Sequence, residues 1–280
     1  MAKVISRLAV VAGAGSYPRQ IIAGAKRAGV PVVDVIAVKG SCERATCKAA
    51  DHAYPFAAGV TDLAIEWIGR QGYDGVILAG QVSPMSLFRG RFNQTVLGWL
   101  KAMPVKNAHT IFGKLVEEFE RNGCLVLPAS CYMDDQMPGL GALTDRGFTE
   151  TEMDDVRRGM QVAADVGRHD VGQTVVVKSG MVLAVEAFEG TNAAIRRAGR
   201  LNRGSVLCKA AREGHDWRFD IPVVGLKTLK TMHRAGVTAL AFQAGRLILL
   251  DREAVVAYAN RRGIAIVGID SGLPPAPLRP

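Results

Sequence analysis

Cysteines are few in this chain, and their arrangement argues against two kinds of cysteine-based structure. The five cysteines form no CxxC pair, and their number is odd. Disulfide-stapled domains use an even set of closely spaced cysteines, and zinc knuckles use paired CxxC motifs. We therefore expect neither a disulfide framework nor a zinc knuckle, and the reducing cytosol is the expected compartment.

Long apolar runs are also absent. No run approaches the roughly 20 residues that a membrane-spanning helix requires. The chain starts with a basic segment and the apolar stretch 8–15, an order that superficially matches a signal peptide. That stretch is short and continues into a turn and an amphipathic segment, so we expect neither a signal peptide nor a spanning helix.

Several motifs that would identify a catalytic or nucleotide site are missing. The sequence has no GxSxG elbow and no GxxxxGK[ST] loop, and its histidines show no HxxxH or HExxH spacing. A hydrolase of the serine-elbow type, a P-loop protein and a zinc protease therefore have no support.

The charge balance favours an anionic partner. Lys and Arg number 35 against 26 Asp and Glu, which gives a net charge of +9. Aromatic residues make up only 6% of the chain and do not interleave with a basic stripe, so nucleic-acid binding is not expected. An acidic lipid surface and a phosphorylated metabolite both remain open.

The hydrophobic pattern of the first half predicts a Rossmann-like domain over residues 1–133. The chain has 280 residues, enough for two domains. Apolar runs at 7–12, 31–38, 74–79 and 124–127 predict strands, and helical spacing predicts helices at 17–28, 61–69 and 109–121. Because strands and helices alternate, we expect a parallel, doubly wound sheet.

The second half predicts a mixed α/β domain over residues 149–280, after a linker at 134–148 rich in glycine and polar residues. Strands at 174–178 and 182–187 flank a Ser179-Gly180 hairpin turn, which indicates antiparallel pairing. Further strands are predicted at 205–210, 238–242, 247–250 and 265–269, and helices at 149–167, 193–199, 226–235 and 253–262. The tail 273–280 holds four prolines and is expected to be loose.

A glycine turn, Gly13-Ala14-Gly15-Ser16, follows the first predicted strand. Such a turn lets backbone amides approach a phosphate at a helix N-terminus. The dinucleotide fingerprint needs a third glycine where Pro18 stands, and Asp34, nearest to the ribose-binding position, lies inside the second strand. NAD or FAD binding is therefore disfavoured. A plain strand-to-helix turn and a phosphate- or nucleotide-facing loop of another kind both remain open.

Two clusters in the second half carry candidate chemistry. Glu186, Glu189, Gly190 and Thr191 gather at a strand-to-helix junction, where carboxylates can hold a divalent cation and glycine admits a phosphate. The alternative is that Glu189 or Thr191 only caps the following helix. In that helix Arg196, Arg197 and Arg200 suit either a phosphate clamp or a solvated face.

The second cluster centres on Asp220. This aspartate follows Arg218 and precedes an Ile-Pro step. A carboxylate beside a guanidinium stays ionised and suits metal binding or the orientation of a water molecule. From the spacing alone, a surface aspartate paired with Arg218 is the favoured interpretation.

Together these segments resemble the LpxI-type UDP-2,3-diacylglucosamine diphosphatases of lipid A biosynthesis. The resemblance rests on residues 11–18 (VAGAGSYP), Gly80-Gln81-Val82, 167–177 (GRHDVGQTVVV), 184–191 (AVEAFEGT) and 219–225 (FDIPVVG), in family order. It implies two α/β domains with the substrate between them. The implied reaction is hydrolysis of the pyrophosphate of UDP-2,3-diacylglucosamine to UMP and 2,3-diacylglucosamine 1-phosphate, with Mg²⁺ or another divalent cation.

The resemblance also suggests roles for single residues. The essential aspartate of the family corresponds to Asp220, which we expect to be catalytic and a metal ligand together with Glu186 and Glu189. The expected substrate-binding residues are Gly13, Gly15, Ser16, Gly80, Gln81, Gly190, Thr191 and Arg196. A cytoplasmic protein peripheral to the inner membrane, in contact with a UDP-linked lipid and able to form a homodimer, would fit this role.

The chain departs from the family pattern at two places. Asn107-Ala108-His109 stands after Lys106, where relatives often have Gly-Asp-Asp, and Asn192 replaces an aspartate. A non-catalytic or altered-specificity protein that binds a UDP-lipid or a nucleotide with the same fold is therefore the alternative function.

Overall fold

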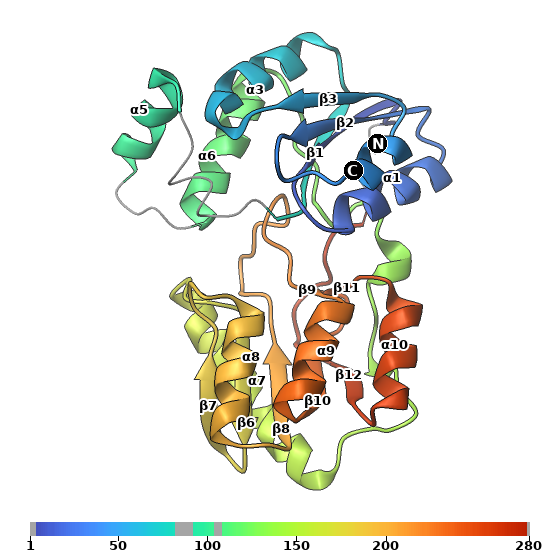
Figure 1. The fold of residues 1–280 in the computed structure, drawn as a ribbon, viewed down its shortest axis with the longest axis vertical. Helices are drawn as coiled ribbons and strands as arrows, with labels where there is room; N and C mark the ends of the chain where they lie inside the picture. Colours follow the sequence, from blue (N-terminus) through green and yellow to red (C-terminus); the bar gives the residue numbers. More distant parts are fainter. Residues whose placement is uncertain (1–3, 82–91, 104–107, 279–280) are drawn as a thin grey trace. The chain divides into compact units, whose positions relative to one another are not determined.

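The computed structural model describes residues 4–81, 92–103 and 108–278. The chain divides into two compact units (Figure 1). Unit 1 consists of Met1–Asp134, Asp216–Asp220 and Pro277–Pro280, and unit 2 consists of Asp135–His215 and Ile221–Ala276. The backbone therefore passes between the units several times, and a short piece of the second half belongs to unit 1.

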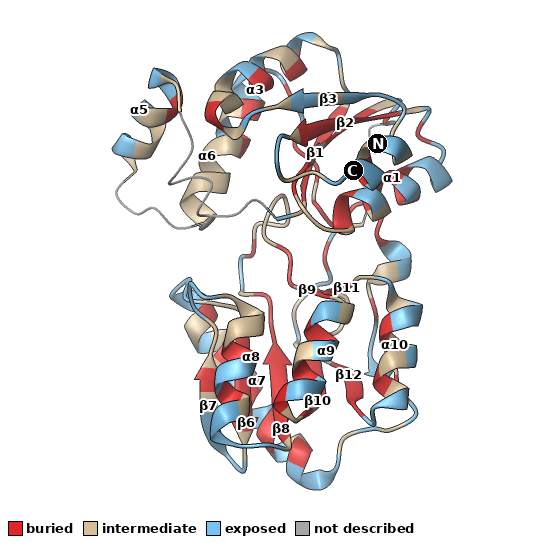
Figure 2. Cartoon of the chain, viewed as in Figure 1, coloured by how far each residue is buried: buried red, intermediate tan, exposed pale blue. Residues whose placement is uncertain are grey.

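Unit 1 is built on a four-stranded sheet in the order β3-β2-β1-β4, with all strands parallel. The strands are β1 (Arg7–Ala12), β2 (Val32–Val38), β3 (Ala53–Phe56) and β4 (Gly75–Ala79). In β1, β2 and β4 successive side chains are buried on both faces, which is the pattern of a sheet covered on both sides (Figure 2). The predicted parallel sheet is confirmed.

Helices cover both faces of this sheet. They are α1 (Tyr17–Arg27), α2 (Arg44–Ala49), α3 (Thr61–Arg70) and α6 (Ala108–Arg121), with a 3₁₀ turn at Ala58–Val60. A further helix, α5 (Gln94–Ala102), contacts α3. Ile65 and Ile68 of α3 form one core with Val116 and Phe119 of α6, and α1 packs on β1 and β2. Right-handed crossovers on opposite sides of β1 place these helices on opposite faces.

The strand predicted at 124–127 is not formed. The segment makes only an isolated bridge between Val76 and Val126, with backbone hydrogen bonds from Val76 to Leu125 and from Leu127 to Val76. Pro128 follows directly and has no backbone N–H to extend the pairing.

Unit 2 contains a six-stranded mixed sheet in the order β5-β12-β10-β8-β6-β7. Its strands are β5 (Gly141–Ala142), β6 (Thr174–Lys178), β7 (Met181–Val185), β8 (Ser205–Lys209), β10 (Val237–Gln243) and β12 (Ala265–Ile269). The central strands β8, β10 and β12 are parallel, whereas β6 and β5 pair antiparallel at either side. A separate parallel pair joins β9 (Val223–Val224) and β11 (Ile248–Leu249). The mixed sheet predicted from the hairpin is confirmed.

Alternate side chains of β8 face two helical layers. Val206 and Cys208 pack with Val156 of α7 (Glu150–Arg168), while Leu207 lies in a core with Ile195 and Leu229. Ile195 and Leu229 belong to α8 (Thr191–Leu201) and α9 (Leu226–Ala235), which share their layer with α10 (Arg252–Arg261). Because successive side chains of a strand point to opposite faces, α7 lies across the sheet from α8, α9 and α10.

The start of α7 is held by a capping box and a buried ion pair. The Thr149 hydroxyl accepts a hydrogen bond from the Glu152 backbone N–H, and Glu152 Oε2 accepts one from the Thr149 N–H. Arg146 donates to both carboxylate oxygens of Glu152, at 2.7 and 2.9 Å, and Thr238 donates to Oε1 at 2.8 Å. The acidic first turn seen in the sequence therefore has a structural role.

The predicted linker and tail take part in the packing. In the linker, the 3₁₀ turn Asp134–Gln136 and β5 appear, and Leu143 N–H donates to the Ile266 carbonyl. The expectation of a loose tail is wrong: Ala276 is buried, Pro277 accepts a hydrogen bond from Ser130, and Leu278 accepts one from Tyr132. No described helix is long and apolar enough to cross a bilayer.

Candidate functional site

The glycine turn of unit 1 closes against the loop after β4. Gly13 N–H donates to the Ala79 carbonyl at 2.8 Å, and Ala14 and Gln81 exchange backbone hydrogen bonds at 2.7 and 2.9 Å. From β1 the chain crosses to β2 on one side, while β4 lies on its other side. This is the switch point of the sheet, where open α/β sheets bind ligands beyond the carboxyl ends of their strands.

The close approach at this edge requires glycine. A Cβ on Gly13 would lie 2.5 Å from the Gln81 carbonyl oxygen, and one on Gly80 would lie 2.8 Å from the Ala14 carbonyl oxygen. Gly80 also has a φ of 86°, which disfavours other residues. Three predicted substrate-binding residues, Gly13, Gly80 and Gln81, are thus brought together.

The predicted residues Gly15 and Ser16 lie at the open side of the same turn. A Cβ on Gly15 would meet nothing within 4 Å, and its N–H donates to the Glu43 carboxylate at 3.2 Å. Ser16 is the N-cap residue of α1 but makes no side-chain capping hydrogen bond. The backbone amide here already holds a negatively charged group, as a helix N-terminus does for a phosphate.

Asp220 is the last residue of the segment Asp216–Asp220, which comes from the second half of the sequence but belongs to unit 1. Ala129 N–H donates to the Trp217 carbonyl at 2.7 Å, and the Phe219 ring stacks on Phe112 of α6, with 5.9 Å between centroids. Asp220 is half-buried, and its N–H donates to the Asp216 carbonyl at 3.3 Å. The segment therefore fixes the backbone at Asp220 against unit 1.

Arg218 ties this segment together electrostatically. Its guanidinium donates to Asp216 at 2.9 and 2.8 Å and to Glu120 of α6 at 2.6 Å. Burial raises the pKa of Asp216, but hydrogen bonds and charge from Arg218 outweigh it, so the pKa is lowered overall. The Arg218 guanidinium, which the sequence suggested as a partner of Asp220, contacts Asp216 and Glu120.

In unit 2, Glu186 belongs to a buried polar cluster at the carboxyl ends of β7 and β8. Thr191 donates to Glu186 Oε1 at 2.7 Å, and Lys209 Nζ donates to Thr174 and Thr191 at 3.0 and 3.1 Å. Glu186 Oε2 lies 3.6 Å from Lys209 Nζ and accepts no hydrogen bond. Burial opposes ionisation of Glu186, but the Lys209 charge and the threonine hydroxyls lower its pKa overall.

Lys209 is a candidate functional residue that the motif search missed. Only 5% of its side chain is exposed, and it stands at the end of the otherwise apolar strand SVLCK. A buried lysine is rare unless it is paired. The sequence signal that could have revealed Lys209 is that it is the single charged residue of the buried strand SVLCK.

Further buried polar groups lie along the same sheet edge. Gln243 ends β10, which pairs parallel with β8, and its side-chain oxygen accepts from Ala211 N–H and Arg246 Nε at 2.9 and 3.2 Å. Arg246 is almost fully buried, and burial lowers its pKa. The Glu186 carboxylate offsets the charge of Lys209, and Arg246 adds a further positive charge at this edge, which suits an anionic ligand.

The other predicted residues of unit 2 have different surroundings. Glu189 pairs with Arg197 at 2.6 Å and not with the Lys209 cluster. Gly190 is the N-cap residue of α8 with a φ of 80°, and Arg196 is exposed on that helix. Across the three described stretches, no group of three or more His, Cys, Asp or Glu is placed to hold a metal ion.

The two departures from the family pattern are the segment 107–109 and Asn192. Lys106 and Asn107 lie outside the described residues. Asn192 is the second residue of α8, and its buried side-chain oxygen has no hydrogen-bond partner among the described residues.

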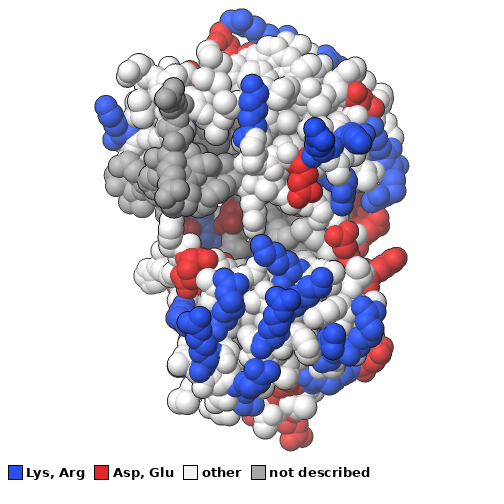
Figure 3. Space-filling view, in the orientation of Figure 1, with Lys and Arg blue, Asp and Glu red and all other residues white. Residues whose placement is uncertain are grey.

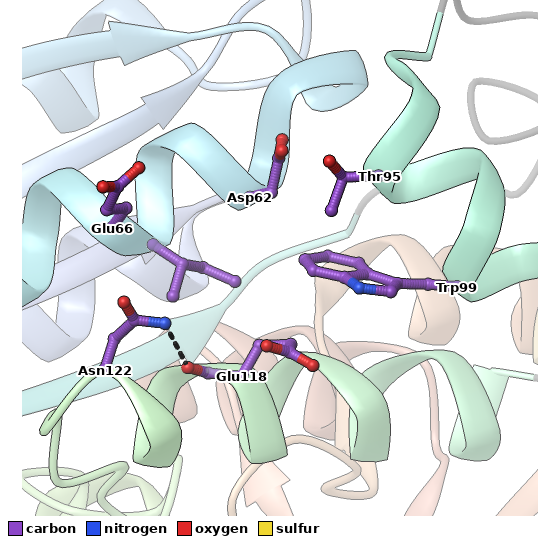
Figure 4. A pocket seen from close by; sticks show the side chains of 7 residues that line it. Asp62, Glu66, Thr95, Trp99, Glu118 and Asn122 are labelled. Carbon is purple, nitrogen blue, oxygen red and sulfur yellow. Dashed lines mark hydrogen bonds between the residues drawn. The ribbon is translucent and has the colours of Figure 1, made fainter.

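A separate pocket of about 270 Å³ in unit 1 contains none of the predicted site residues (Figure 4). It is lined by Asp62, Ile65, Glu66, Thr95, Trp99, Glu118 and Asn122. Its carboxylates already have partners: Asp62 accepts from Asn93, Glu66 from Arg70, and Glu118 pairs with Lys114 and Arg121. Three acidic side chains make this pocket unsuited to a phosphorylated ligand.

The fold and the two sheet edges define an α/β protein of two units, each with groups suited to a phosphate at the carboxyl ends of parallel strands. Residues 7–136 match the family model described as the LpxI N-terminal domain, and residues 139–267 match the LpxI C-terminal domain. The chain belongs to the LpxI family.

A curated relative supports the family assignment. The protein named UDP-2,3-diacylglucosamine pyrophosphatase LpxI, from Caulobacter vibrioides, is 34% identical over 212 residues, which cover 71% of this chain and 76% of the relative. The resemblance stated from the sequence motifs is thereby confirmed.

Solved structures resemble the chain only distantly. The biotin carboxylase domain of a thermophilic 2-oxoglutarate carboxylase is 10% identical with a TM-score of 0.29, and the biotin carboxylase subunit of a pyruvate carboxylase is 14% identical with a TM-score of 0.28. Each comparison covers 62% of this chain and 35% of the other, so the chain spans about a third of those proteins. Similarity this low has no bearing on function.

Proposed function

We propose that this protein hydrolyses the pyrophosphate bond of UDP-2,3-diacylglucosamine to UMP and 2,3-diacylglucosamine 1-phosphate. The observation that carries the proposal is the match to both LpxI domains, together with a 34% identical relative named for that activity. In this reaction the oxygen of water bonds to one phosphorus, and the bridging oxygen leaves with the other phosphate.

Each unit, taken by itself, has groups of the kind that bind a phosphate. Phosphoryl transfer depends mainly on positioning and on neutralising charge at the phosphoryl oxygens. At the edge of unit 2, the ammonium of Lys209 and the guanidinium of Arg246 are fixed by buried hydrogen bonds. In unit 1, the amide of Gly15 and the N-terminus of α1 face an open side of the glycine turn.

Asp220 is proposed as the carboxylate that holds a divalent cation or orients the water. The proposal for Asp220 rests on its correspondence to the essential aspartate of the family pattern, while Glu186 faces Lys209 and Glu189 pairs with Arg197. Mg²⁺ commonly binds through one or two carboxylates together with phosphate oxygens and water, so a single protein carboxylate fits this chemistry. When bound, the cation would neutralise charge on the diphosphate.

The second candidate function is binding of a UDP-lipid or a nucleotide without hydrolysis, or with another specificity. Its basis is that Asn192 departs from the family pattern described above, and that Glu186 and Glu189, both predicted metal ligands, face Lys209 and Arg197. Contact with the inner membrane surface is also proposed, because the substrate carries two acyl chains. A homodimer is proposed from the family resemblance alone.

The test is UMP release from UDP-2,3-diacylglucosamine dispersed in detergent, with MgCl₂ or with EDTA. We expect Mg²⁺-dependent release in the wild type and a loss of at least about a hundredfold in Asp220→Ala. Asp154→Ala on the exposed side of α7 is the matched control and should retain full activity. Tight binding of the lipid without any UMP release would establish the second candidate instead.

A further inference from the structure

Helices α8 and α9 present an outer face that carries basic but no acidic residues. Neither helix contains Asp or Glu, in the sequences TNAAIRRAGRL and LKTLKTMHRA. Their exposed basic residues are Arg196, Arg197, Arg200, Lys227, Lys230 and Arg234. Figure 3 shows Lys and Arg gathered over these two helices. We call this surface the basic face.

The basic face is a continuous layer. Ile195 and Ala198 of α8 and Leu229 and Met232 of α9 are buried in one core, and the two helices contact each other along the same side of the sheet. Since the inner sides of both helices are committed to that core, their charged side chains are directed to solvent. Glu189, which precedes the helix, neutralises Arg197. The other exposed basic residues of the face keep it cationic.

Exposed apolar side chains flank α8 at both ends. Phe188, two residues before the N-cap Gly190, is 82% exposed, and Leu201, the last residue of the helix, is 65% exposed. A cluster of Lys and Arg on a helical surface is attracted to the anionic lipids of a bilayer, and exposed apolar side chains beside it gain from burial in the headgroup region. Binding of single-stranded nucleic acid would instead call for aromatic stacking platforms among the charges, and α8 and α9 contain no Phe, Trp or Tyr.

We propose that the basic face docks on an anionic lipid bilayer, with Phe188 entering the headgroup region. The inference rests on the proposed function, because a diacylated substrate has to be reached at a bilayer. Each Lys or Arg near an anionic surface strengthens binding, and the attraction falls off within a Debye length, so salt should weaken it.

The test is co-sedimentation of the full chain with vesicles of phosphatidylcholine alone or of phosphatidylcholine with phosphatidylglycerol. We expect salt-sensitive binding to the anionic vesicles only. The double variant Lys227→Glu, Lys230→Glu should reduce the partition coefficient at least about tenfold, and Phe188→Ser should reduce it several-fold. The matched control is Arg157→Glu, Arg158→Glu on α7, which makes the same change in net charge on the opposite side of the sheet and should bind as the wild type does.

Equal losses in the two double variants would overturn the proposal, as would equal binding to neutral vesicles or a preference for duplex DNA over anionic vesicles. UMP release from detergent-dispersed substrate is measured in parallel and should be the same in both double variants and the wild type. If the wild type releases UMP but does not co-sediment with anionic vesicles, only the docking surface is refuted. Vesicle docking through α9 without UMP release refutes the proposed hydrolysis alone.

Discussion

Arg218 and Glu120, which are 98 positions apart in the sequence, form an ion pair with 2.6 Å between Nη1 and Oε1. The pair ties the segment that ends at Asp220 to helix α6 of unit 1. Beside it, the stacked rings of Phe219 and Phe112 make a second attachment. Asp220 is thus positioned by contacts on the two residues directly before it.

The first prediction concerns this positioning. Phe219→Ala removes the stacked ring, and an aromatic pair of this kind contributes about 0.5–1.5 kcal/mol. We expect kcat for UMP release to fall about tenfold with little change in KM, because Asp220 loses its fixed backbone. Phe219→Tyr keeps the ring and should restore kcat. A rise in KM at unchanged kcat would show that the ring contributes to substrate binding instead.

The second prediction concerns the buried pair of Lys209 and Glu186. Lys209→Met leaves the Glu186 carboxylate buried without an opposing charge, which should lower the free energy of unfolding by about 3–5 kcal/mol. Urea denaturation measures this. The double variant Lys209→Met, Glu186→Gln removes both charges and should recover much of the stability but none of the activity. Recovery of activity as well would contradict a role for Lys209 at the diphosphate.

The third prediction is a pH dependence of stability from Glu152. Burial opposes ionisation of this carboxyl, but hydrogen bonds from Arg146, Thr149 and Thr238 lower its pKa from 4.5 to about 2. Since the folded-state pKa is the lower one, the stabilisation is complete above pH 4.5 and is lost as the pH falls towards 2.

Urea denaturation between these pH values should show the loss in the wild type. In Glu152→Gln this part of the pH dependence should vanish. The exposed neighbour Glu150→Gln should leave the wild-type curve unchanged, and equal effects of the two substitutions would contradict the assignment.

The fourth prediction concerns the close approach of Gly13 to Gln81. Gly13→Ala places a methyl group 2.5 Å from a backbone oxygen that cannot move without breaking the loop pairing. Overpacking of this kind typically costs about 1–3 kcal/mol. Gly98→Ala in α5 meets nothing within 4 Å and should be neutral or stabilising by up to about 1 kcal/mol. Thermal melting of the two variants compares them directly, and equal melting temperatures would refute the steric argument.

Much of the fold was predictable from local sequence because buried strands leave a clear apolar pattern. The strands Arg7–Ala12, Thr174–Lys178 and Ala265–Ile269 and the helix Leu226–Ala235 occur with the predicted bounds. β3 was missed because it is a short edge strand that contains Pro55 and alternates between exposed and half-buried residues.

The candidate site was less predictable because its contacts are tertiary. The segment FDIP identified Asp220, yet nothing near it in the sequence shows that residues 216–220 pack on α6. The glycines at 13 and 80 were found as motif residues, whereas their mutual approach depends on two strands meeting side by side. The contact between Arg218 and Glu120, which lie far apart in the sequence, could not be predicted from local sequence.

Because unit 1 contains segments from both halves of the sequence, the chain cannot be cut between the halves without removing contacts. A fragment that stops at residue 136, where one family model ends, would lack the ring that covers Phe112 and the carbonyls that satisfy Ser130 and Tyr132. The complementary fragment would carry Phe219 with no aromatic surface to receive it. A cut at residue 136 therefore removes packing and hydrogen-bond partners from both fragments, and we expect neither to fold stably alone.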